Sequence, residues 1–257
     1  MKIIKKNLRL LRRVNFRFLR LLLYSLFRLW LKKIHNIKGL PQKGPCIIIS
    51  NHTSYIDWIV LSAVYKEKYL VFLGNKELSK RPIVSWLMNL NILVYIDPEK
   101  PGYSYFREII KRLKEGYIVV IYPEGTRSRN GKMIEPKLGF VKLALITGIP
   151  IIPIGFKGAF EILPPNMNLP KLKRCEIFVG NKIIVDKSNI LFKDVFAKDN
   201  NARMISKESM REIAFRIMNV VRNMVAQDWD KSVNWNPSEK HLKYLSEYSR
   251  PFSCQNK

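Results

Sequence analysis

Residues 46–66 read CIIISNHTSYIDWIVLSAVYK, a short apolar run, a polar segment and a longer apolar run. The opening CIIIS has the length and the β-branched content of a buried strand. The closing IDWIVLSAVYK is long enough for a helix, and Thr53 and Ser54 before it are residue types that often cap a helix N-terminus. The stretch therefore predicts a strand, a loop and a helix in succession, which is the repeating unit of an α/β fold.

The rest of the chain repeats this alternation. Further strands are predicted at 69–74, 92–97, 117–123, 151–156 and 176–185, and helices at 82–90, 104–116, 135–148 and about 200–225. Gly116 and Gly148 stand where two of these helices should end. Alternation at this spacing predicts an α/β fold with a largely parallel or mixed central sheet flanked by helices. The tail after Trp229 is polar and predicted to be irregular.

The composition places the chain among folded proteins with an anionic partner. It is 47% hydrophobic, which excludes a disordered protein, and its net charge is +26. Residues 1–56 hold 13 Lys and Arg and no Asp or Glu, so this segment supplies half of the net charge. Such a field attracts nucleic acid, an anionic membrane surface or phosphorylated substrates.

The cysteines indicate a reducing environment. There are three, an odd number, at positions 46, 175 and 254, and none forms a CxxC pair. This pattern predicts neither a disulfide framework nor a zinc site, as in a cytosol-facing protein.

Residues 1–34 are predicted to form a helical arm, followed by a domain over 35–257. Basic residues recur at helical spacing on one face of the arm: Arg9, Arg13, Arg17, Arg20, Arg28 and Lys32. Leucine, phenylalanine and tryptophan fill much of the remaining surface, which is typical of a helix lying in an anionic membrane interface. Only seven uncharged residues separate Arg20 from Arg28, too few for a membrane-spanning helix of about 20 apolar residues.

The expected location is therefore a membrane surface, on its cytosol-facing leaflet. Two alternatives for the arm remain open: a helix packed on its own domain, and a helical hairpin that dips into one leaflet. No small-residue cleavage site follows the arm, so a secretory signal is not expected.

His52 and Asp57 are the first candidate catalytic pair. Asp57 is the first acidic residue of the chain and follows one of only three histidines by five positions. In the first turn of the predicted helix, its carboxylate can accept a hydrogen bond from one imidazole nitrogen and leave the other free as a base. Because no serine or cysteine is placed as a nucleophile, such a base would activate a substrate hydroxyl. The alternative is that Asp57 only caps a helix, and this spacing often arises by chance.

A second polar segment, EGTRS, follows the predicted strand YIVVIYP. Ligands of an open α/β sheet bind where strands end, so the two segments are expected to share one cleft. Gly125 permits close backbone approach, Thr126 offers a hydroxyl, and Arg127 offers a bidentate fork for phosphate. Glu124 could orient Arg127 or bond a substrate hydroxyl. A simple tight turn is the alternative reading of this segment.

The blocks NHTSYID, NKELSKRPIVSWLMNL, YPEGTRS and GIPIIPIGF, in this order, resemble those of glycerolipid acyltransferases. More narrowly, they resemble the 1-acylglycerol-3-phosphate (lysophosphatidate) acyltransferase family, over about residues 35–185. The resemblance implies an α/β domain with a membrane-associating N-terminal helical element. Two positions depart from the family pattern, Ser85 and Pro98, and both bear on the acceptor more than on the reaction.

The resemblance also implies roles for individual residues. His52 is the expected general base, and Asp57 the residue that orients it. Lys76 and Arg127 are expected to hold the substrate phosphate. Independently of the resemblance, the EGTRS segment predicts Glu124, Gly125 and Thr126 as further substrate-binding residues. No metal is expected.

The implied reaction transfers a fatty acyl group from an acyl thioester to lysophosphatidate, forming phosphatidate in phospholipid biosynthesis. The thioester, from acyl-CoA or acyl-carrier protein, is a co-substrate, and no cofactor is expected. Other lysophospholipids such as lysocardiolipin, or glycerol 3-phosphate, are alternative acceptors. A nucleic-acid-binding protein is the alternative from another class, and no zinc-finger, RNP-like or helix-turn-helix pattern supports it. An inactive membrane scaffold is a third alternative, and the intact blocks disfavour it.

Overall fold

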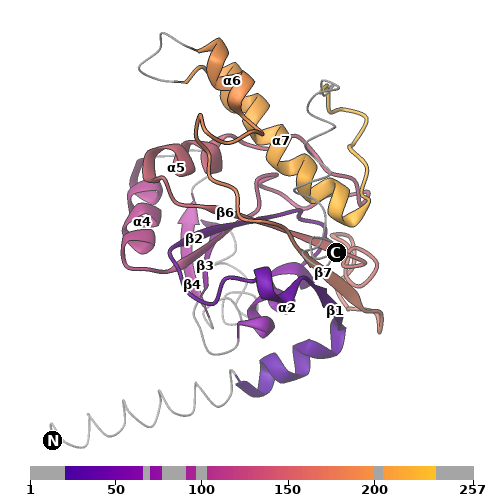
Figure 1. Ribbon diagram of the computed structural model, residues 1–257. Helices are drawn as coiled ribbons and strands as arrows, with labels where there is room; N and C mark the ends of the chain where they lie inside the picture. The colour runs from indigo at the N-terminus through magenta and orange to yellow at the C-terminus, as the bar shows by residue number, and fades with distance from the viewer. Residues whose placement is uncertain (1–20, 66–69, 77–90, 97–102, 200–204, 236–257) are drawn as a thin grey trace, which may run out of the picture.

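The computed structural model describes residues 21–65, 70–76, 91–96, 103–199 and 205–235 (Figure 1). The predicted helix at 82–90 and the first 20 residues of the arm lie outside this part. The described part contains a seven-stranded sheet of order β1-β7-β6-β2-β5-β3-β4. Its strands are β1 (Leu31–His35), β2 (Cys46–Ser50), β3 (Leu70–Asn75), β4 (Ile92–Ile96), β5 (Ile118–Ile121), β6 (Ile151–Lys157) and β7 (Cys175–Val179).

The sheet is mixed, as predicted. Strands β2 to β6 run parallel to one another, whereas β7 pairs antiparallel to β6 and carries β1 in parallel on its outer edge. The predicted strand at 176–185 is shorter than expected: β7 ends at Val179, and Ile183 forms a single antiparallel bridge to Ile151.

The described helices are α2 (Ile56–Val64), α4 (Tyr103–Lys114), α5 (Gly139–Thr147), α6 (Lys193–Lys198) and α7 (Lys207–Val225), with 3-10 turns η1 (Arg28–Trp30) and η2 (Ile37–Gly39). The helices predicted at 104–116 and 135–148 are confirmed with small shifts of their bounds. The helix predicted over 200–225 is confirmed from Lys207 onward, where Ser206 caps it by accepting a hydrogen bond from Ser209 N. Helix α6 was not predicted.

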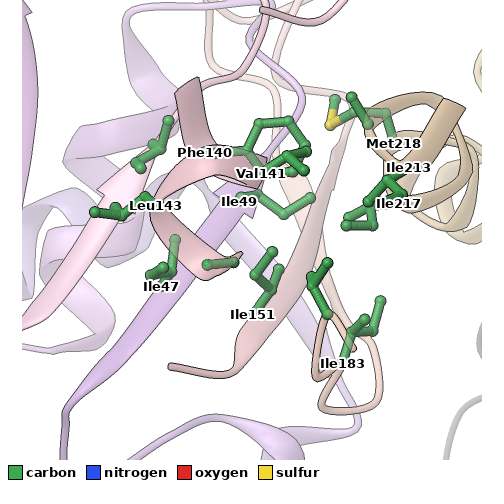
Figure 2. Packing of buried hydrophobic residues seen from close by; sticks show 14 of the residues in the cluster. Ile47, Ile49, Phe140, Val141, Leu143, Ile151, Ile183, Ile213, Ile217 and Met218 are labelled. Atoms are coloured by element: carbon green, nitrogen blue, oxygen red, sulfur yellow. The ribbon is translucent and has the colours of Figure 1, made fainter. Parts of the chain in front are cut away.

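Alternate side chains of each central strand face opposite helical layers. Ile47 and Ile49 of β2 belong to a core with α4, α5 and α7, whereas Cys46 and Ile48 belong to a core with α2. Figure 2 shows the first of these cores, where Ile47 and Ile49 approach side chains of α5 and α7. Because β2 is wholly buried on both faces, it carries an unbroken apolar run rather than an alternating one.

The prediction of a helical arm over residues 1–34 is wrong at its C-terminal end. Within the described residues, 21–27 are helical and are followed by η1 and then by the edge strand β1. Strand β1 forms because its side chains find partners on β7. Lys32 Nζ and His35 Nε2 lie 2.9 Å and 2.6 Å from the two carboxylate oxygens of Glu176. The His35 ring also stacks on Phe178, with centroids 4.1 Å apart.

The helical residues 21–27 contact the α/β domain through one face only. Tyr24 is fully buried beside Ala63 of α2, and its hydroxyl accepts a hydrogen bond from Asn91 Nδ2 at 2.9 Å. The opposite face exposes Leu21, Leu22 and Leu26. Among the helices that the structure describes, none is both long and apolar enough to cross a membrane.

Candidate active site

The two predicted loops meet at one edge of the sheet. Strands β2 and β5 are parallel neighbours, with Ile49 opposite Ile121 in the register, so their following loops leave the sheet side by side. Ser128 N, at the end of the second loop, donates a hydrogen bond of 2.8 Å to the carbonyl oxygen of His52. The shared cleft that the sequence predicts therefore has its two loops in direct contact.

His52 and Asp57 form a hydrogen-bonded pair. Nδ1 of His52 lies 3.0 Å from Oδ2 of Asp57, and this oxygen also accepts the backbone N–H groups of Thr53 and Ser54 at 2.9 Å each. Asp57 is completely buried in the first turn of α2. Because the carboxylate accepts, Nδ1 of the neutral ring carries the proton and Nε2 holds the free lone pair.

The surroundings of His52 leave Nε2 available. The imidazole ring stacks on Tyr122, with centroids 4.1 Å apart and planes 20° apart. Its side chain is 16% exposed, and Nε2 makes no hydrogen bond within the described residues. Burial, and secondarily the charge of Asp57, raises the pKa of Tyr122 well above its usual value. The Tyr122 hydroxyl therefore stays protonated, and an uncharged ring packs against one face of the imidazole.

Glu124 holds the two loops together from inside. One carboxylate oxygen accepts His52 N at 2.8 Å and the other accepts Ile134 N at 3.0 Å, and the side chain is buried. Burial, with a smaller contribution from the charge of Asp57, raises the pKa of Glu124 to about 8, although the two backbone hydrogen bonds oppose the shift. This geometry gives Glu124 a role in positioning the His52 loop, in addition to the two roles that the sequence left open, orienting Arg127 and bonding a substrate hydroxyl.

The EGTR segment is a tight turn with an open face. Gly125 N donates to Tyr122 O at 2.9 Å, and Gly125 adopts φ 69°, in the left-handed region that favours glycine. Gly125 and Thr126 are exposed at the surface of the turn. The guanidinium carbon of Arg127 lies 3.3 Å from the centroid of the Tyr55 ring, so the ring holds Arg127 beside the His52 loop.

One further cation lies over this turn, and a second follows a strand that ends at the same edge of the sheet. A Cβ atom on Gly125 would come within 2.7 Å of both Cε and Nζ of Lys137, so the ammonium of Lys137 lies directly over the glycine. Lys76 is exposed and follows β3, which pairs in parallel with β5 and therefore ends at the same edge of the sheet. The rest of the block after Lys76, with Ser85 and Pro98, lies outside the described residues.

Sequence reasoning missed Tyr122, Tyr55 and Lys137 as parts of this site. Tyr122 stands at the end of an apolar run and reads as another core residue. Lys137 is 12 positions beyond Gly125, and only the fold of the intervening loop brings its side chain back over the turn. Asn51, next to His52, has a structural role, because its amide group bonds both Phe156 N and Phe156 O at 2.8 Å and 2.9 Å.

The sequence profile of the acyltransferase family matches residues 32–157, the segment that contains the His52–Asp57 pair and the EGTR turn. Residues 32–157 of this chain thus resemble the acyltransferase family. A chloroplastic 1-acyl-sn-glycerol-3-phosphate acyltransferase of Brassica napus is 28% identical over 144 residues, which are 54% of this chain and 41% of the relative. A 1-acyl-sn-glycerol-3-phosphate acyltransferase of Bacillus subtilis is 29% identical over 126 residues, 49% of this chain and 62% of the relative.

The alignment thus spans 41% to 62% of the length of these two relatives. The crystal structure of the 1-acyl-sn-glycerophosphate acyltransferase from Thermotoga maritima matches the fold with a TM-score of 0.58 at 21% identity. That match covers 82% of this chain and 78% of the other. The family predicted from the motif blocks is confirmed by these comparisons.

The cysteine thiols of the described acyltransferase domain are poor nucleophiles. Cys46 and Cys175 are buried and free of disulfides, and burial raises the pKa of each to about 12. Both therefore remain protonated near neutral pH, so the thiolate that covalent catalysis needs is scarce. A base acting directly on a substrate hydroxyl fits this arrangement better than a covalent cysteine intermediate.

Proposed function

We propose that the protein transfers a fatty acyl group from an acyl thioester to the free hydroxyl of lysophosphatidate, forming phosphatidate. The observation that carries the proposal is the His52–Asp57 hydrogen bond beside a turn with several cations. The relatives named as 1-acyl-sn-glycerol-3-phosphate acyltransferases support the same reaction. The turn and its cations supply the hydrogen-bond donors and the positive charge that would bind the phosphate of such an acceptor.

In the proposed reaction, His52 acts as the general base. Nε2 removes the proton of the acceptor hydroxyl while the oxygen attacks the thioester carbonyl. The carbon–sulfur bond then breaks, and the proton passes from Nε2 to the departing thiolate. Asp57 keeps Nδ1 protonated and stabilises the imidazolium that forms between these steps. Acyl transfer changes no oxidation state, so the reaction calls for no redox cofactor, and the thioester itself is the co-substrate.

The acceptor phosphate is proposed to bind at the EGTR turn. Arg127 offers two parallel N–H donors, which match the geometry of phosphate oxygens. Gly125 lets the phosphate approach the backbone, Thr126 adds a hydroxyl, and Lys76 and Lys137 add positive charge at the same edge. An acceptor anchored in this way has its hydroxyl held near Nε2, and such positioning contributes up to ~7–11 kcal/mol to lowering the barrier.

The protein is proposed to work at an anionic membrane surface, on the cytosol-facing leaflet. In the described part of the arm, leucines face outward next to exposed basic residues. The exposed leucines are Leu21, Leu22, Leu26 and Leu29, and the exposed basic residues are Arg28, Lys32 and Lys33. Apolar residues rimmed by cations suit an interface of acyl chains and anionic headgroups, and they suit nucleic acid poorly.

A donor-by-acceptor activity matrix on the detergent-solubilised full chain tests the proposal. Acyl-CoA and acyl-carrier protein are crossed with lysophosphatidate, lysocardiolipin, a further lysophospholipid and glycerol 3-phosphate. We expect the largest kcat/KM with lysophosphatidate, and a higher value with another acceptor would replace the proposed substrate.

The His52→Ala variant identifies the base in the same assay. We expect its kcat to fall by roughly 10²–10⁴. The matched control is His35→Ala, which removes the histidine stacked on Phe178 at the far edge of the sheet and should leave kcat near that of the wild type. Activity of His52→Ala near the wild-type level would contradict the proposed mechanism.

A further inference from the structure

The loop between β6 and β7 exposes apolar side chains that no part of the described protein covers. Leu169 is 77% exposed and Leu172 is 100% exposed. Three exposed basic residues accompany them: Lys171, Lys173 and Arg174. Residues 162–175 contain no Asp or Glu. A single exposed leucine is ordinary, but two on the acid-free segment of this loop that follows Glu161, together with three cations, repeat the composition of the N-terminal arm.

This loop has a defined conformation and lies against the arm. Lys171 N donates to Ile162 O at 2.8 Å, which closes the loop on itself. Trp30 Nε1, in the 3-10 turn directly after the helical residues 21–27, donates to Lys171 O at 3.1 Å. This hydrogen bond places Lys171 of the loop next to the C-terminal end of the helical residues 21–27.

The base of the loop reaches the candidate active site. Ser54 Oγ donates a hydrogen bond of 2.7 Å to Leu163 O, in a buried position. The backbone N–H of the same serine binds Oδ2 of Asp57 at 2.9 Å. One continuous path of contacts thus joins Trp30, the loop and the carboxylate that orients His52.

We propose that residues 164–174 form a second lipid-contacting element, which inserts Leu169 and Leu172 into an anionic lipid surface. Lys171, Lys173 and Arg174 then face the phosphate headgroups. A lipid surface is the occupant that fits, because residues 164–174 carry cations and no acidic residue, and because Lys171 is hydrogen-bonded to Trp30 of the cationic, leucine-rich arm. Two membrane contacts orient a protein on a membrane better than one contact does. The second contact, the β6–β7 loop, is also hydrogen-bonded to the His52 loop through Ser54. The inference rests on the proposed membrane association and is separable from the choice of acceptor.

A fluorophore on the loop tests the insertion directly. The probe is an environment-sensitive dye on Leu172→Cys in a Cys254→Ser background, where Cys46 and Cys175 are buried. The control carries the dye on Ile146→Cys, a 59% exposed position on α5. Vesicles are phosphatidylcholine with or without phosphatidylglycerol, and co-sedimentation is measured on the same samples.

We expect a blue shift and a brighter signal at position 172 with the anionic vesicles only, and no change at position 146. An unshifted signal at 172 on protein that co-sediments would overturn insertion of the loop and leave the proposed function standing. Equal shifts at both positions would overturn it as well, because they indicate non-specific adsorption. A protein that fails to co-sediment at all contradicts the membrane association itself.

A paired substitution gives an independent functional readout. In Leu169→Ser with Leu172→Ser, we expect vesicle affinity to fall by roughly 10²-fold or more, because two buried leucine side chains are lost from the contact. Turnover of lysophosphatidate embedded in vesicles should fall with it, whereas turnover in detergent should match the wild type. Ile146→Ser is the matched control. Equal losses in vesicles and in detergent would indicate a damaged site and overturn the lipid role of the loop.

Discussion

Oδ2 of Asp57 lies 3.0 Å from Nδ1 of His52 and accepts the backbone N–H groups of Thr53 and Ser54 at the same time. A single buried oxygen thus sets the position of the imidazole, its tautomer and the path of the loop that carries it. The other oxygen, Oδ1, is buried with no hydrogen-bond partner among the described residues. The hydrogen bonds to this carboxylate from the described residues are therefore all made at the oxygen that contacts His52.

Asp57→Asn is expected to lower kcat by roughly 10²–10⁴, because an amide can present N–H to Nδ1 and favour the wrong tautomer. The two backbone N–H groups lose part of their acceptor, so we also expect a lower Tm. The measurements are steady-state kinetics and thermal unfolding. The matched control is Asp186→Asn, at an exposed turn remote from His52, which should keep full kcat. Full kcat in Asp57→Asn would contradict the orienting role.

Arg127→Ala is expected to raise the KM for lysophosphatidate at least tenfold, because one charge-assisted hydrogen bond to phosphate contributes about 1.5–3 kcal/mol. The KM for the acyl thioester should stay nearly constant. Arg129→Ala removes an exposed arginine two residues further on and is the control. An unchanged acceptor KM in Arg127→Ala would mean that Arg127 of the EGTR turn does not bind the phosphate.

Lys137→Gln is expected to raise the acceptor KM less than Arg127→Ala does. The ammonium over Gly125 is exposed to solvent, where an ion pair contributes only ~0.2–1 kcal/mol, or up to about fivefold in KM. High salt should erase this difference between the variant and the wild type, because it screens an exposed pair. A salt-independent defect would instead point to a structural role of Lys137 in holding the turn.

Glu124 should make stability depend on pH. Its folded pKa of about 8 exceeds the ordinary value of 4.5, so the folded state binds more protons between these two values. The free energy of unfolding should therefore fall as pH rises from 4.5 to about 8, and change little from this group beyond that range.

Glu124→Gln removes this titration, so the slope should disappear, while one backbone N–H loses its acceptor and Tm falls at low pH. Urea unfolding over this pH range measures both effects. Glu161→Gln, at an exposed position, should keep the slope of the wild type. A variant of Glu124 with an undiminished slope would mean that another group carries the pH dependence.

Sequence patterns predict the local parts of the site well. His52 and Asp57 are five residues apart, so a loop and one helical turn are enough to bring them together. The two loops contact each other because parallel neighbouring strands end at one edge of a sheet, which follows from the α/β pattern. These relationships depend on backbone geometry over short distances, which residue types largely determine.

Partners far apart in the sequence were not predicted. Leu31–His35 has the leucine and lysine content of the preceding helix, and it becomes a strand only because β7, about 140 residues later, offers an edge and Glu176. The inward turn of Glu124 likewise depends on Ile134 N and on burial, which the sequence does not encode locally.

The sequence by itself therefore determined the alternation of strands and helices, the family resemblance, and the His52–Asp57 pair that is proposed to carry the chemistry. Only the tertiary structure decided that Glu124 faces inward, that Lys137 returns over Gly125, and that an acid-free loop lies between Trp30 and Ser54. The physical reason is the range of the interactions. Periodicity and turn chemistry act over a few residues, whereas burial and side-chain contacts depend on chain segments that only the folded sheet brings together.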